Sequence, residues 1–131
     1  MSAEFPIQAA LFARLADIGV RVVDVEPQAA DGGSSANFPY IEIGEVVMTP
    51  LDTYTDLGHN FVARIHTRTR GGGRAAAKLL QGEIYSLLHR HALAVQGFHC
   101  LTLHREYSEC TRAPDGSFHG VCEYRGLIDA A

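Results

Sequence analysis

Histidine and carboxylate side chains are the residues of this sequence that could do chemistry, and their spacing limits what that chemistry could be. The chain has seven histidines, but His89 and His91 are two positions apart on an expected helix, so their side chains point in different directions. The sequence lacks a His-Glu-x-x-His pattern, a Gly-x-Ser-x-Gly elbow and a phosphate-binding loop ending in Gly-Lys-Ser or Gly-Lys-Thr. We therefore expect no catalytic site, metal or cofactor. A small enzyme that uses histidine and carboxylate residues is kept as an alternative.

The arginines form one basic cluster around a glycine turn at residues 71–73. Its members are Arg64, Arg68, Arg70 and Arg74. The formal net charge of the chain is -4, which argues against a general nucleic-acid binder, because such domains are normally basic. The cluster is then either a solvated strand end or a surface that meets an acidic neighbour or DNA in transit. A nucleic-acid-binding module built on these arginines is the second alternative.

Composition sets the class of protein. With 131 residues, 47% of them hydrophobic and 20% charged, the chain has the size and composition of one globular domain, here residues 1–131. No apolar run reaches the roughly 20 residues that a bilayer requires, so we expect no membrane partner. The three cysteines are odd in number and lack a Cys-x-x-Cys spacing, which favours small buried side chains in a reducing cytoplasm.

The strand and helix that flank the glycine turn are expected to form the centre of the fold. In residues 59–70, Phe61, Ala63 and Ile65 alternate with polar side chains, which predicts a half-buried strand. From residue 74 the period becomes helical, and the residues assigned to the apolar stripe are Ala76, Leu80, Ile84, Leu87 and Leu88. The residues assigned to solvent are Lys78, Gln81 and Glu83. The helix can then cover the apolar face of the strand.

The chain before this unit predicts a helix, a short strand and a loop. Pro6 suits the first turn of a helix, and Ile7, Leu11, Leu15 and Ile18 follow at helical spacing up to Gly19, which is expected to end it. Residues 20–25 are β-branched and predict a short strand. Residues 26–38 contain a glycine- and serine-rich stretch with little to bury, which predicts a mobile loop.

Residues 40–48 predict a strand that is apolar on both faces. Ile41, Ile43 and Val47 are assigned to one face, and Tyr40, Val46 and Met48 to the other. Apolar residues on both faces require cover on both, so the strand is either central or meets another subunit through Tyr40, Val46 and Met48.

Residues 49–58 form a connection longer than an ordinary hairpin turn, so we expect a projecting loop. Its candidate contact residues are Thr49, Pro50, Leu51, Asp52, Thr53, Tyr54 and Leu57. The apolar residues among them are larger than those that a solvent-exposed loop without a binding role normally exposes together. They could instead fold back onto the core.

The last third of the chain predicts a hairpin. A strand over residues 98–110 is expected to place Leu101, Leu103 and Tyr107 on one face, and residues 113–117 contain the Pro-Asp-Gly sequence of a tight turn. In the final strand, Phe118, Cys122, Tyr124 and Ile128 share a face. The predicted fold is α+β: a mainly antiparallel sheet of about four main strands plus one short strand, with two helices packed on one face.

Three groups of residues, in their order and spacing, resemble the small tail-completion family of phage and prophage tail operons and gene-transfer-agent clusters. They are Pro39 to Glu45 followed by Thr49 to Thr53, then Ile65 to Lys78 across the glycine turn, and finally Pro114 to Gly116 with His119 and Gly120. The resemblance covers most of the chain. The sequence departs from it in the glycine- and serine-rich stretch of residues 31–35, and at Thr67 to Thr69, where relatives more often carry an aromatic residue.

The resemblance implies a structural virion protein that catalyses nothing. It implies a tail terminator. Such a protein is one subunit of a ring, expected to be a hexamer, that caps the tail tube, stops its polymerisation and joins it to the head connector. Its partners would be other copies of itself, the tail tube protein and the connector or stopper, with DNA present only in transit. Its place would be the head-tail junction of a virion or tail-like particle, assembled in the bacterial cytoplasm. Another junction protein, such as a stopper or a tube-like subunit, is the nearest alternative.

Overall fold

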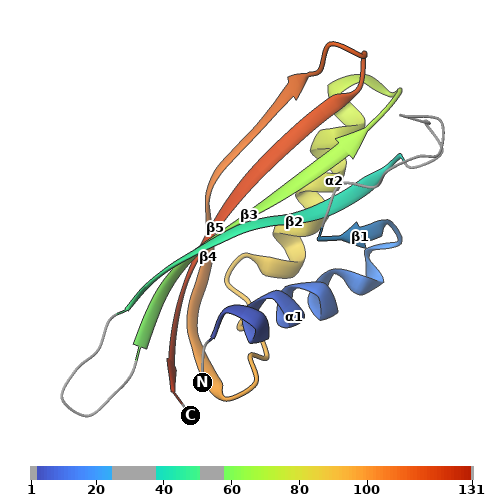
Figure 1. The fold of residues 1–131 in the computed structure, drawn as a ribbon. Coiled ribbons are helices and arrows are strands. Elements are labelled where there is room, and N and C mark those ends of the chain that lie inside the picture. Colours follow the sequence, from blue (N-terminus) through green and yellow to red (C-terminus); the bar gives the residue numbers. More distant parts are fainter. Residues whose placement is uncertain (1–2, 25–37, 51–57, 131) are drawn as a thin grey trace.

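The computed structural model describes residues 3–24, 38–50 and 58–130. The elements in chain order are helix α1 (Glu4–Leu15), 3-10 turn η1 (Ala16–Ile18), strands β1 (Arg21–Val23), β2 (Tyr40–Pro50) and β3 (Gly58–Thr69), helix α2 (Gly73–Leu88), and strands β4 (Phe98–Arg112) and β5 (Phe118–Ala130). The sheet has the order β1-β2-β3-β5-β4. Strand β1 runs parallel to β2 and every other neighbouring pair is antiparallel (Figure 1). The predicted α+β fold with a mainly antiparallel sheet is confirmed.

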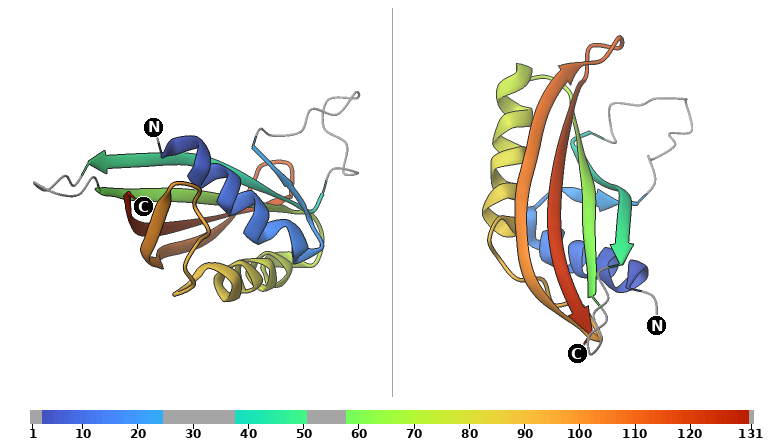
Figure 2. Two further views of the ribbon diagram at one scale, coloured as in Figure 1. Left: turned by 90° about the horizontal axis from the view of Figure 1, so that it is seen from below. Right: turned by 90° about the vertical axis from the view of Figure 1, so that its left-hand side faces the viewer.

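Both helices cover the same face of the sheet, and the opposite face carries no helix in the described part of the chain (Figures 1 and 2). The core lies between the helices and this covered face. Its largest aliphatic and aromatic members are Ile7, Leu11, Leu15, Ile41, Ile43, Phe61, Ile65, Leu80, Ile84, Leu88, Leu93, Leu103, Tyr124 and Ile128. Full burial of one such side chain stabilises the fold by about 1.5–3 kcal/mol before entropy is counted. The helical stripes and the strand alternation therefore meet in one hydrophobic layer.

Helix α1 is fixed to the fold by its buried apolar stripe and by hydrogen bonds from Arg14 near its C-terminal end. Ile7, Leu11 and Leu15 are buried, as the sequence spacing predicts. The guanidinium of Arg14 donates hydrogen bonds to the carbonyl oxygens of Leu87 and Ala92, at 3.2 and 2.5 Å. These bonds satisfy carbonyl groups at and after the end of α2, where no helical partner exists. α1 is thus tied to the segment that follows α2 as well as to the sheet.

Helix α2 begins at Gly73, the last of three glycines, and buries one polar residue that the sequence pattern assigns to solvent. Residues 71–73 all have positive φ, between 61° and 79°, a region that glycine enters without steric cost. The predicted stripe is confirmed at Leu80, Ile84 and Leu88. The assignment of Gln81 to solvent is wrong, because its side chain is buried and its Nε2 donates to the carbonyl oxygen of Glu109 at 2.8 Å.

The predicted C-terminal hairpin is confirmed, with two irregularities in β4. The register between β4 and β5 shifts between Cys100 and Thr102 and again between Arg105 and Tyr107. Each shift moves the following side chains to the other face. As a result Leu103 is buried, whereas Leu101 and Tyr107 are exposed, and the predicted shared face of these three residues is wrong. In β5, Cys122, Tyr124 and Ile128 are buried as predicted.

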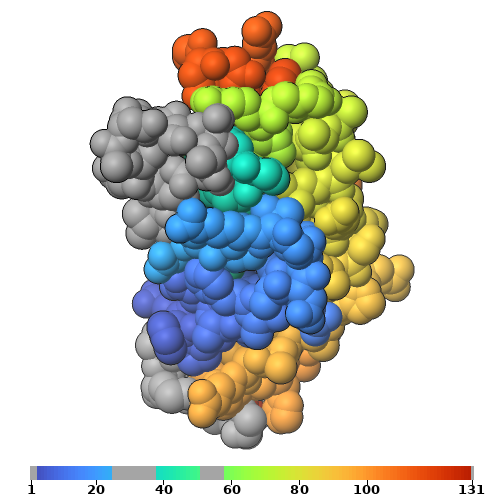
Figure 3. Space-filling model, turned by 90° about the vertical axis from the view of Figure 1, so that its right-hand side faces the viewer, coloured from blue at the N-terminus to red at the C-terminus, as the bar shows by residue number. Residues whose placement is uncertain are grey.

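The helical side of the molecule is formed mainly by α1, β1 and α2. Figure 3 shows α1 and β1 beside α2, with the segment after α2 below them.

None of the described helices is both long and apolar enough to cross a membrane.

Candidate assembly interface

The uncovered face of the sheet carries a network of ion pairs centred on Arg64. Its Nε donates to Glu123 Oε1 at 2.8 Å, and its Nη1 lies 3.6 Å from Glu45 Oε2. The hydrogen bond to Glu123 raises the pKa of Arg64. Beside it, Arg125 forms an ion pair with Glu106, and this hydrogen bond lowers the pKa of the carboxyl group. Arg64 is therefore neutralised by carboxylates of its own chain, and it is not part of a free basic patch.

Two histidines on the same face are in direct contact. His66 Nδ1 and His119 Nε2 are 2.9 Å apart, with the rings stacked at 5.1 Å between centroids. His66 Nε2 also lies 3.7 Å from Glu45 Oε1. A hydrogen bond between two imidazoles needs one donor and one acceptor nitrogen. The backbone of Gly44 lies close against the His66 ring, since a Cβ at position 44 would lie 2.6 Å from His66 Nε2.

Arg70 and Arg74 lie at the end of the sheet where the turn after β3 meets the turn between β4 and β5. Arg70 Nη2 is 2.9 Å from Asp115 Oδ2, and its guanidinium stacks over the Phe38 ring at 4.6 Å. The guanidinium of Arg74 lies 5.7 Å from the centre of the Phe118 ring. Arg68 precedes them on β3, opposite Tyr40 on the neighbouring strand. The predicted grouping around the glycine turn therefore holds for Arg70 and Arg74, whereas Arg64 belongs to the separate network.

The turn at this end is held by a carboxylate. Asp115 Oδ1 accepts hydrogen bonds from the Ser117 hydroxyl at 2.5 Å and from the Ser117 backbone N–H at 2.9 Å. These bonds, with the ion pair to Arg70, lower the pKa of Asp115. The Pro-Asp-Gly turn predicted from the sequence thus has the side-chain bond that favours aspartate in such turns.

The predicted division of β2 into two apolar faces is corrected by a bulge. The register between β2 and β3 shifts between Ile43 and Val46, so that Val46 and Met48 pack against the core together with Ile41 and Ile43. Val47 is turned outward instead and is 63% exposed. Tyr40 is buried, and its ring packs against that of Phe38. The structure thus leaves little surface of Tyr40, Val46 and Met48 for a partner.

The candidate contact loop of residues 49–58 falls mostly outside the described residues. Thr49 and Pro50 end β2 and are exposed, and Gly58 begins β3. Strands β2 and β3 pair as an antiparallel hairpin around this connection. Leu51, Asp52, Thr53, Tyr54 and Leu57 lie outside the described residues, as does almost all of the loop predicted at residues 26–38. Their roles stay predictions.

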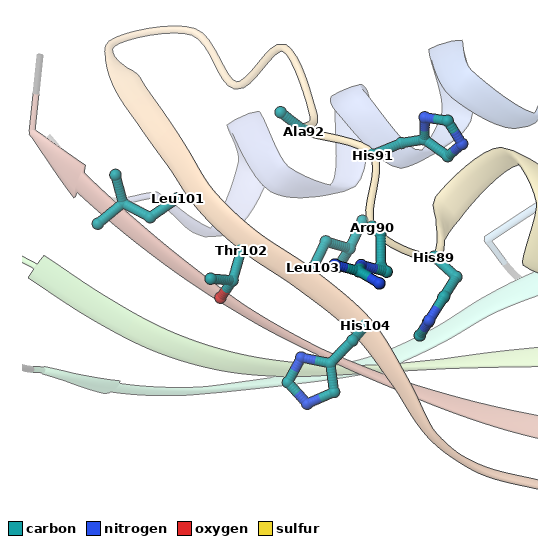
Figure 4. A pocket seen from close by; sticks show the side chains of 8 residues that line it. All are labelled: His89, Arg90, His91, Ala92, Leu101, Thr102, Leu103 and His104. Atoms are coloured by element: carbon teal, nitrogen blue, oxygen red, sulfur yellow. The ribbon is translucent and has the colours of Figure 1, made fainter.

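Sequence reasoning missed a pocket at the β4 edge of the sheet. The segment after α2 and strand β4 enclose a volume of about 590 Å³ (Figure 4), lined by His89, Arg90, His91, Ala92, Leu101, Thr102, Leu103 and His104. Arg90 has a φ of 63°, unusual for a residue with a side chain, and its backbone N–H donates to Leu103 O at 2.7 Å. The only sequence signal was the run of two histidines and one arginine at residues 89–91.

His89 holds the segment against the strand. Its Nδ1 accepts a hydrogen bond from the Arg105 backbone N–H at 3.1 Å, and its ring stacks on Tyr85. Partial desolvation and the charges of Arg90 and Arg105 lower the pKa of His89. The imidazole is therefore neutral at pH 7 and can act as this acceptor.

Metal-ion chemistry has no cluster to support it in the described part of the chain. No group of three or more histidine, cysteine, aspartate or glutamate side chains there could hold a metal ion. Cys100, Cys110 and Cys122 are free, and burial raises the pKa of the Cys122 thiol.

Comparisons with known proteins place the chain in a family. The family model described as tail completion protein gp17 matches residues 9–129. The fold resembles a protein in the solved structure titled "Virion of native gene transfer agent (GTA) particle", with a TM-score of 0.83, 18% identity and 98% of both chains covered. A second solved structure matches with a TM-score of 0.59 and 15% identity, over 100% of this chain and 98% of the other. No curated protein matches the sequence. Because the family model spans nearly all of the sequence, this chain belongs to the tail completion protein gp17 family.

Proposed function

We propose that this protein is a structural subunit of the head-tail junction, a terminator that closes the end of the tail tube. Several copies form a ring, expected to be a hexamer, which stops tube polymerisation and provides a docking surface for the head connector. Its neighbours are further copies of itself, the tail tube protein and the connector or stopper, and DNA passes through the ring without being held. The protein resides in the virion or tail-like particle and has no enzymatic role.

The match of the tail completion family model to residues 9–129 carries this proposal. Two further observations support it. The similar fold comes from the solved structure of a native gene transfer agent virion. The two edges of the sheet differ: β1 and the exposed end of β2 form one edge, and β4 forms the other. A head-to-tail ring joins two different surfaces of each subunit.

The test is deletion of the gene in a strain that makes the particle, followed by electron microscopy. Without the protein we expect tails of irregular, excessive length and DNA-filled heads that carry no tail. A plasmid copy of the gene should restore uniform, joined tails. Native mass spectrometry of the purified protein, alone and with tube protein, then gives the ring size. Particles of normal length and normal joining after deletion would refute the proposal.

A further inference from the structure

The two flanks of the sheet carry different surfaces, a pocket on one and an exposed aromatic side chain on the other. On the β4 flank is the pocket of about 590 Å³ between the segment after α2 and strand β4 (Figure 4). Part of its wall is apolar, since Ala92, Leu101 and Leu103 line it, and Leu101 is 54% exposed. A partner that covered Leu101 would remove this apolar surface from water, which favours association.

On the opposite flank, the first turn of α1 presents a projecting aromatic side chain. Phe5 is 77% exposed, the most exposed large hydrophobic residue among those described. It borders an open groove of about 570 Å³ between α1 and β2, lined also by Gly44 and Val46. Strand order places β2 and β4 on opposite sides of the two central strands, and Figure 2 shows the start of α1 beside β2. Phe5 therefore cannot fill the β4 pocket of its own chain.

The charges around the two surfaces have opposite signs. Glu4 lies next to Phe5 and lines the same groove. The pocket is lined by the guanidinium-bearing Arg90. Complementary charge steers association and fixes the register of an interface. A phenylalanine beside a carboxylate matches a pocket that has apolar walls and one arginine.

We propose that Phe5 and Glu4 at the start of α1 dock into the β4 pocket of a second copy of this chain, with Phe5 against Leu101 and Glu4 beside Arg90. This contact joins neighbouring subunits of the ring and rests on the proposed function for the closure of that ring. Because the two surfaces are different, the contact is head-to-tail, so each subunit offers Phe5 to one neighbour and its pocket to the other. A buried aromatic anchor surrounded by weaker contacts is the usual energetic centre of an interface.

The edge of β4 explains why side chains, and not a continued β-ladder, form this contact. The Leu103 carbonyl already accepts the Arg90 N–H, and the Arg105 N–H donates to His89. The middle of the edge strand is therefore occupied by its own chain, a common protection against uncontrolled strand pairing. An inserted side chain such as Phe5 can use the space beside it without pairing with the strand.

Disulfide trapping tests the contact directly. In a Cys100→Ser, Cys110→Ser background, the variant carrying both Phe5→Cys and Leu101→Cys should give a ladder of covalent oligomers that ends at the ring size under mild oxidation, both in concentrated protein and in tails. An equimolar mixture of the two single-cysteine variants should give covalent dimers only. The matched control pairs Leu101→Cys with Val121→Cys, on the uncovered face of the sheet, and should give no ladder.

The outcomes separate this contact from the function on which it rests. Rings seen by native mass spectrometry or on tail ends, without cross-links from Phe5→Cys and Leu101→Cys, would refute the contact and leave the proposed function standing. Absence of any ring, with normal tails after gene deletion, would refute the proposed function. Cross-linking between Phe5→Cys and a different tail protein, but not between copies, would also overturn the proposal.

Discussion

Gln81 shows how a single polar side chain is used where α2 meets the sheet. Helical spacing assigned it to solvent, because a pattern of apolar positions gives no sign that an amide lies on the buried stripe. In the fold, Gly120 on β5 leaves the space, since a Cβ there would come within 2.5 Å of Gln81 Nε2. The amide then reaches the Glu109 carbonyl at 2.8 Å. Such a bond depends on strands far away in sequence, so the helix sequence alone could not predict it.

Replacing Gln81 by alanine is expected to destabilise the fold. The substitution leaves a small cavity beside α2 and removes the hydrogen bond to the Glu109 carbonyl, and we expect a loss of about 1–3 kcal/mol in the free energy of unfolding. Urea unfolding followed by circular dichroism measures it. Lys78→Ala, one turn earlier and exposed, is the control and should change stability by less than about 0.5 kcal/mol. Equal stability of the two variants would show that the Gln81 bond contributes nothing.

Asp115 makes the stability of the β4–β5 turn depend on pH. Its pKa is lowered from the ordinary value of 3.8, mainly by the Ser117 hydroxyl and backbone hydrogen bonds. A carboxyl whose folded-state pKa is below its unfolded value stabilises the fold fully above the unfolded value, and this contribution is lost as the pH falls through the folded value.

We therefore expect Asp115→Asn, which keeps an oxygen acceptor but removes the charge, to be less stable than the parent at pH 7. The difference should shrink as the pH falls below about 4, where the parent also loses the charge. Urea unfolding of both proteins between pH 7 and pH 3 gives the two curves. A difference that stays constant across this range would mean that ionisation of Asp115 plays no part.

At the scale of elements, the bulge in β2 decides which side chains face the core. Strict alternation placed Val47 with Ile41 and Ile43, and Val46 with Met48 on the other face. One extra residue near Gly44 reverses the second half of the strand. A glycine inside a strand is the only hint of such a bulge in the sequence, and its direction depends on the partner strand. The helices and the C-terminal hairpin had stronger local signals and could be predicted.

A methyl group at position 44 should disturb the bulge. The added Cβ would meet His66, whose ring is held by contacts with His119 and Glu45, so we expect Gly44→Ala to cost about 1–3 kcal/mol. Gly82→Ala is the control of opposite sign. It lies exposed in α2 with nothing within 4 Å of an added Cβ, and should stabilise the helix by about 0.5–1 kcal/mol. Thermal unfolding of both variants tests the pair, and a stabilising Gly44→Ala would contradict this account.

The connection between β2 and β3 is the element for which a contact role is still a prediction from sequence. If Leu51 and Tyr54 meet the tube or the connector, the variant Leu51→Ser with Tyr54→Ser should keep its free energy of unfolding within about 1 kcal/mol, since exposed sites usually change it by less than about 0.5 kcal/mol each. The same variant should fail to stop tube growth, which electron microscopy shows as overlong or unjoined tails. Early melting would place the two residues in the core, and uniform joined tails would place the contact surface elsewhere.

For the whole molecule, strand order was beyond the reach of local patterns. The sequence predicts a strand over residues 40–48 with two covered faces, but the fold makes β2 a near-edge strand that β1 flanks only at Tyr40, Ile41 and Glu42. β3 and β5 occupy the centre. Apolar alternation sets which face of a strand is buried, whereas its neighbours are chosen by contacts distant in sequence. The surfaces on the two flanks, including Phe5 and the pocket beside Arg90, exist only once that order is known.

A head-to-tail ring makes a defective subunit dominant over the parent. A Phe5→Asp subunit keeps its pocket and can join a growing arc, but it offers no anchor to the next subunit, so a ring that includes it has one broken contact. In a hexamer assembled from equal amounts of parent and variant, only about 1 ring in 64 is entirely parental. Co-expression at equal levels should therefore reduce uniform tails far below half, as counted by electron microscopy. Mixing Phe5→Asp with Arg90→Glu subunits should yield pairs but no rings, because only one of the two mixed contacts joins an intact Phe5 to an intact pocket. A loss of uniform tails merely in proportion to the variant present would contradict a head-to-tail contact through Phe5.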